Sequence, residues 1–146
     1  MTINDKYGRI TMGDDMSYKL EEYYILNIKS YRLLEIETGE YWYPLSLFLR
    51  KFLFRNNNLN TYRDNDKYNQ YMRVIEYDNP DSATDTKTKA WFMNTEGLYI
   101  LLQNTRINNT GSAREKLTKE KYLAAAQNFF GVIPNNPQDY IGYQPD

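Results

Sequence analysis

The chain has 146 residues, contains neither cysteine nor histidine, and carries a formal net charge of -1. This length allows one domain with a buried core. The missing residue types exclude disulfides, thiolate nucleophiles, histidine bases and the commonest zinc ligands. Asp14-Asp15 and Glu21-Glu22 are adjacent carboxylate pairs without the alternating spacing of a calcium loop. We therefore expect a protein that is not an enzyme and that has no cofactor or metal site.

The sequence has no window of about 20 apolar residues, the length needed to cross a bilayer. Its N-terminus also lacks the basic start and apolar run of a signal peptide. We expect no membrane contact and a cytoplasmic location in a bacterial host.

Residues 1–18 mix glycine and aspartate with isolated apolar residues, so we expect an irregular N-terminal arm with a short strand around Tyr7 to Met12. Residues 19–133 are expected to form a single domain. Two β-rich runs lie between Glu22 and Glu37, and the polar pair Lys29-Ser30 separates them. This pattern predicts a hairpin with its turn at that pair.

Tyr41-Trp42-Tyr43 predicts a short third strand, and Pro44 then suits the first turn of a helix. The apolar residues that follow at helical spacing are Leu45, Phe48, Leu49, Phe52 and Leu53. Arg50, Lys51 and Arg55 lie mostly outside this stripe. The helix is therefore expected to have one face in the core and positive charge on another.

The next region is polar and rich in asparagine up to Gln70, which predicts a loop or a short helix. Met72 to Tyr77 predicts a strand, and Asn79-Pro80 begins a loop. Lys89 to Met93 predicts a further strand that pairs with the preceding one.

Two more helices are predicted near the C-terminus. Asn94 is a candidate N-cap for a helix whose apolar face includes Leu98 and Leu102. Ser112 to Glu115 matches a capping box, and Gly131 supplies a stop for the helix that follows. One side of this last helix is predicted to consist of Ala113, Leu117, Tyr122, Ala125, Ala126 and Phe129. We expect a proline- and asparagine-rich tail or linker over residues 134–146.

Together these elements predict an α+β fold, with a small, mainly antiparallel sheet packed against about three helices. Aromatic residues make up 16% of the chain, and 15 of them are tyrosines. Because many tyrosines fall where strands are expected, a role in the core or on a sheet face is favoured over base stacking. Trp42 and Trp91 are interpreted as core anchors.

The main functional lead is a basic segment at residues 50–73. It contains six basic residues and two acidic ones, so its charge of +4 leaves -5 for the rest of the chain. Such an asymmetry indicates a segment that faces an anionic partner. The candidate phosphate contacts are Arg50, Lys51, Arg55, Arg63, Lys67 and Arg73, and weaker candidates for base or backbone contacts are Asn56, Asn57 and Asn58. A solvated helix face followed by a polar loop explains the same pattern.

Two motifs carry a resemblance to a known family. Gly39 to Tyr43 is similar to the "G-x-x-W-F/Y" strand, and Asn94 to Leu102 to the "I-N-E-S-G-L-Y-x-L-I" segment, of the BRO N-terminal domain. The similarity spans about Tyr23 to Gly131. Leu53 to Asn57 departs from the family, which usually has a glycine in the turn after the first helix. The resemblance implies a DNA-binding, antirepressor-like regulatory protein of phage or prophage origin.

The alternative is a small phage-encoded protein that binds and inhibits a host protein, such as a defence or transcription factor. Tyrosine and arginine are favoured as interface anchors, which suits this alternative. A minor virion component is a further alternative. A homodimer would combine two basic patches and so compensate for the near-neutral charge.

Overall fold

A computed structural model of the chain describes residues 2–5, 8–13, 16–56, 58–84, 86–106 and 111–133. Of those up to residue 16, it describes the backbone alone. The strands are β1 (Thr2–Asp5), β2 (Gly8–Gly13), β3 (Met16–Ile25), β4 (Ile28–Glu35), β5 (Tyr41–Pro44), β6 (Met72–Tyr77) and β7 (Thr88–Asn94). The helices are α1 (Leu45–Leu53), α2 (Asn60–Arg63), α3 (Asp66–Asn69), α4 (Thr95–Asn104) and α5 (Ala113–Phe130). The expected α+β fold is confirmed.

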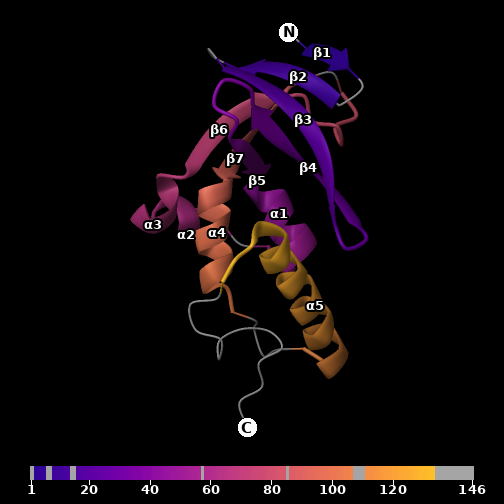
Figure 1. Ribbon diagram of the computed structural model, residues 1–146, viewed down its shortest axis with the longest axis vertical. Coiled ribbons are helices and arrows are strands. Elements are labelled where there is room, and N and C mark those ends of the chain that lie inside the picture. Colours follow the sequence, from indigo (N-terminus) through magenta and orange to yellow (C-terminus); the bar gives the residue numbers. More distant parts are fainter. Residues whose placement is uncertain are drawn as a thin grey trace.

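The seven strands form one antiparallel sheet in the order β1-β2-β3-β4-β5-β7-β6. The sheet curls, so that β2 approaches β6 without pairing with it. Figure 1 shows β1, β2 and β3 crossing the upper end of the molecule. Helices α1, α4 and α5 lie together below, with α2 and α3 on the other side of α4 from α5 (Figure 1).

The N-terminal segment belongs to this sheet. β2 coincides with the strand expected around Tyr7 to Met12, but β1 was not expected, and the predicted boundary at residue 18 falls inside β3. The segment is short and rich in glycine and aspartate, so its pattern is weak. Pairing with β3 supplies hydrogen-bond partners for the β2 backbone that local sequence cannot supply.

The β3–β4 hairpin turns three residues earlier than predicted. Its two-residue turn is Leu26-Asn27, and Lys29 and Ser30 lie inside β4, opposite Tyr24 and Tyr23. This polar pair resembles a break in the sequence, but each residue has a cross-strand position. Lys29 forms an ion pair with Glu22 at 3.2 Å, and Ser30 is buried.

The sheet has a core on each face. On the helix side, strand residues such as Tyr43 and Met93 pack with Phe48 and Phe52 of α1 and with Leu98 of α4. The inner face of the curl is filled by Tyr18, Leu20, Tyr31, Leu33, Trp42, Ile75, Tyr77 and Phe92. These side chains are buried because the sheet folds over itself. The prediction that Trp42 is a core anchor is confirmed, whereas Trp91 is only half-buried.

The predicted signals at the start of α4 and at both ends of α5 are present. The Asn94 side chain accepts a bond from the Gly97 N–H at 3.0 Å, and Ser112 Oγ accepts one from the Glu115 N–H at 3.1 Å. Gly131 ends α5 with φ of +65°. Gly97 also permits close packing, because a Cβ there would lie 2.5 Å from Met93 Cγ.

The buried face of α5 differs from the prediction. Its buried residues are Glu120, Leu123, Ala126 and Gln127, while Leu117 is 65% exposed. Figure 1 shows why: the N-terminal end of α5 extends away from the other helices, and burial begins only at Glu120. The Gln127 side chain is satisfied by donating to the Leu102 carbonyl at 3.0 Å. The expected tail at residues 134–146 lies outside the described residues.

Candidate functional site

The structure does not bring the predicted basic segment into one patch. Arg50 and Lys51 are in α1 and Arg55 follows it, whereas Arg63 is in α2 and Lys67 is in α3. Figure 1 places α2 and α3 apart from the side of the molecule formed by α5 and the β3–β4 hairpin. The segment is contiguous in sequence but divided in space.

Arg73 faces the inside of the curled sheet, which corrects its predicted role as a phosphate contact. Strand alternation places it on the same face as Ile75 and Tyr77. Its Nη1 donates to Glu35 Oε2 at 3.0 Å and to the Tyr18 hydroxyl at 2.9 Å. Its charge is therefore paired with that of Glu35 inside the fold.

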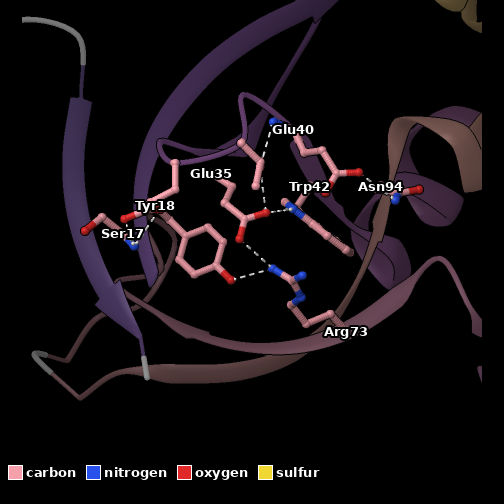
Figure 2. A network of polar contacts seen from close by, with 9 residues as sticks. Ser17, Tyr18, Glu35, Glu40, Trp42, Arg73 and Asn94 are labelled. Atoms are coloured by element: carbon pink, nitrogen blue, oxygen red, sulfur yellow. Dashed lines mark hydrogen bonds and ion pairs between the residues drawn. The ribbon is translucent and has the colours of Figure 1, made fainter. Parts of the chain in front are cut away.

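Figure 2 shows this polar network around Glu35. Glu35 Oε1 accepts bonds from Thr38 Oγ1 at 2.9 Å and from Trp42 Nε1 at 3.2 Å, and the Arg73 guanidinium lies 4.1 Å from the Trp42 ring centroid. Burial by itself raises the pKa of a carboxyl, but the three donors and the charge of Arg73 hold the pKa of Glu35 below its usual value. Glu35 therefore stays ionised near neutral pH, and the network stabilises the fold.

The next two cations lie near aromatic rings. The Arg63 guanidinium is 5.4 Å from the Trp91 ring centroid, and Lys67 Nζ is 5.9 Å from that of Tyr68. Arg63 is half-buried and Lys67 is exposed. These two residues belong to the α2–α3 side of the molecule.

The remaining cations are near the end of α1. Lys51 Nζ donates to the Lys29 carbonyl in β4 at 2.6 Å, and Arg55 Nη2 donates to the Arg106 carbonyl beyond α4 at 2.6 Å. Arg50 is exposed. Of the predicted asparagines, Asn56 and Asn58 are exposed and Asn57 lies outside the described residues.

The same end of α1 has an unusual backbone. Leu26 in the β3–β4 turn (φ +54°) and Phe54 after α1 (φ +55°) are the two non-glycine residues with positive φ in the part of the chain that the structure describes. A positive φ at a bulky L-residue costs about 1–2 kcal/mol, so glycine or asparagine is preferred at such positions. Both side chains are partly in solvent, at 49% and 41% exposure.

These two residues lie on the same surface. The ring centroids of Phe54 and Tyr122 are 5.5 Å apart, and the Tyr122 hydroxyl donates to Asn27, the neighbour of Leu26, at 2.9 Å. An open hollow of about 330 Å³ adjoins Phe54. It is lined by Phe54, Arg114, Glu115, Thr118 and Lys119. We call Leu26, Asn27, Phe54, Tyr122 and the four α5 residues of the hollow the Phe54 surface.

Most of the Phe54 surface was not predicted from the sequence. Leu26 belongs to an apolar run that predicts a strand. Phe54 lies with Leu47 outside the main apolar stripe of α1, a position that suits either packing against another element or contact with a partner. A second signal was the turn at Leu53 to Asn57, which contains no glycine, although a glycine commonly ends a helix. Asparagine follows at residues 56–58, yet the left-handed position is occupied by Phe54.

The described ranges contain no group of three or more histidine, cysteine, aspartate or glutamate residues that could hold a metal ion. No helix within them is long and apolar enough to cross a membrane.

Comparisons with protein-family models, curated proteins and solved structures found no match to this chain. The resemblance of Gly39 to Tyr43 and of Asn94 to Leu102 to the BRO N-terminal domain therefore stays a prediction.

Proposed function

We propose that this chain is a non-catalytic module that binds another protein through the Phe54 surface. The observation that carries the proposal is the pair of bulky, exposed side chains, Leu26 and Phe54, held at positive φ on adjacent segments. Backbone strain of this kind persists where the surrounding structure enforces it, and it concentrates at functional sites. Selection for stability alone would favour glycine or asparagine at both positions.

The apolar character of the surface supports a protein ligand. Phe54 and Tyr122 are aromatic, and aromatic residues are enriched among the anchors of protein interfaces. A protein-binding role in the cytoplasm of a bacterial host, with a host protein as the ligand, is part of this proposal.

A peptide-display selection against the full chain tests the proposal. We expect the wild type to enrich peptides that no longer bind when Phe54 and Leu26 are both replaced by glycine. Thermal unfolding of this variant checks that its fold is kept. The proposal fails if no peptide is enriched, or if the enriched peptides bind the glycine variant equally well.

DNA binding is the second candidate. It is favoured by the succession of Arg50, Lys51 and Arg55 along α1 and its end. Two further cations, Arg114 and Lys119, line the hollow beside Phe54. Binding to mixed-sequence duplex DNA should weaken steeply with salt, and Arg50→Ala with Lys51→Ala should reduce the slope. Absence of binding at low salt would eliminate this candidate.

A further inference from the structure

The hollow beside Phe54 has a cationic rim. Arg114 and Lys119 line it, and Arg55 follows Phe54 directly. The structure has three ion pairs among its described residues, which are Lys29–Glu22, Arg32–Glu21 and Arg73–Glu35. Neither of the two lining cations takes part in these pairs, and neither does Arg55.

The hollow is also lined by one carboxylate, Glu115, whose negative charge offsets one of the two lining cations. Glu115 Oε1 accepts a bond from Ser112 Oγ at 3.3 Å as part of the N-terminal cap of α5. Arg55 uses one nitrogen on a backbone carbonyl, which leaves its positive charge uncompensated. The hollow therefore combines an apolar wall, Phe54, with a net positive rim.

From this combination we infer that the Phe54 surface takes an acidic segment of the partner protein, with one bulky apolar side chain placed in the hollow against Phe54. This inference rests on the proposed function and specifies the chemistry of the partner. Acidic residues on either side of the apolar anchor would face Arg55, Arg114 and Lys119. Complementary charge of this kind raises the association rate and fixes the orientation of the segment.

A nucleic acid fits this surface less well. Its phosphates would contact the rim but leave the side chain of Leu26 in water. The cations that would extend the contact, Arg63 and Lys67, belong to the α2–α3 side, and Arg73 is paired with Glu35. A protein segment can use both the charge and the apolar area.

Peptides enriched by the full chain provide the test, because their sequences and their binding can be examined separately. We expect aspartate and glutamate around a leucine, isoleucine, phenylalanine or tryptophan. Dissociation constants measured by fluorescence anisotropy should rise at least about 30-fold in Phe54→Gly, the change typical of an interface hot spot. We call the double variant Arg114→Ala with Lys119→Ala the rim variant. Its dissociation constants should rise about 3- to 30-fold at low salt and less at higher salt.

Lys67→Ala is the matched control, because it removes a cation of the other side and should leave peptide binding unchanged. Phe54→Ala is a second truncation, and it should weaken binding as much as Phe54→Gly does.

The outcomes separate the two proposals. One outcome is that the enriched peptides need Phe54 but are neutral, and that neither salt nor the rim substitutions change their binding. This outcome overturns the acidic-segment inference and leaves the proposal of a protein-binding module intact. Peptides that bind independently of Phe54 overturn both. A third outcome is that mixed-sequence duplex DNA binds the wild type more tightly than the peptides do, and that the rim variant no longer binds this DNA. This outcome overturns the acidic-segment inference in favour of a nucleic-acid ligand.

Discussion

Arg73 and Arg55 come from the same basic segment, yet their surroundings differ. The two regions differ in whether the arginine has a carboxylate partner and in whether the nearby apolar side chains are buried. Around Arg73 the charge meets a buried carboxylate, and each oxygen of Glu35 has a donor. Around Arg55 the charge has no carboxylate in the described structure, a phenyl ring is exposed, and the backbone at Phe54 is strained. The first region stabilises the fold. We interpret the second as a binding surface, whose strained backbone lowers the stability of the fold.

The largest expected effect concerns the region around Arg73 and Glu35. Glu35→Gln should lower the free energy of unfolding by about 2–3 kcal/mol, because it leaves Arg73 without its counter-ion inside the curled sheet. The effect of a fully buried pair would be larger, but the Arg73 side chain is 34% exposed. Urea denaturation measures the change. Glu22→Gln is the control, since its ion pair with Lys29 is exposed and should matter by less than about 0.5 kcal/mol.

The pH dependence of stability is a second test of the contribution of Glu35. Because the pKa of Glu35 is lowered in the folded protein, its contribution is present above the unfolded pKa of about 4.3 and is lost as pH falls through the folded value. Below that unfolded pKa, the wild type should therefore lose more stability than Glu35→Gln does. Denaturation at a series of acidic pH values tests this. Parallel curves for the two proteins would mean that Glu35 has an ordinary pKa.

A smaller effect is expected at the β3–β4 turn. A two-residue turn in which the first residue has positive φ favours glycine there. Leu26→Gly should be about 1 kcal/mol more stable than Leu26→Ala, because alanine keeps the strain and glycine removes it. Thermal unfolding compares the two variants. Equal stabilities would show that the turn is relaxed in the wild type.

The smallest effect should be on the rim of the hollow. Arg114, which is exposed, and Lys119, which is half-buried, have no ion-pair partner among the described residues. Arg114→Ala and Lys119→Ala should therefore each change stability by less than about 0.5 kcal/mol. Chemical denaturation checks this. A loss of several kcal/mol would assign these residues to the fold and remove them from the proposed surface.

Much of the fold could be predicted from the sequence, because its signals are local. The strands at Tyr41 and Met72, the start of α1 after Pro44, and the caps at Asn94, Ser112 and Gly131 all depend on neighbours in the chain. The hairpin turn could not be located, because Lys29 and Ser30 owe their strand conformation to partners in β3.

The candidate site was less predictable, because it depends on tertiary contacts. Charge counting cannot distinguish Arg73, which faces inward in β6, from Arg50, which faces solvent in α1. The Phe54 surface joins a turn, a helix end and the first half of α5 across nearly a hundred residues. Its local signals are a turn without glycine and the position of Phe54 outside the main apolar stripe of α1.

The central claim is that Leu26 and Phe54 are kept at positive φ for binding, at a cost in stability. The most direct test measures unfolding and peptide binding together for the double glycine variant and the double alanine variant. We predict that the glycine variant is about 2 kcal/mol more stable than the alanine variant, and that both lose peptide binding. A glycine variant that is no more stable than the alanine variant, or that binds peptides like the wild type, would contradict the claim.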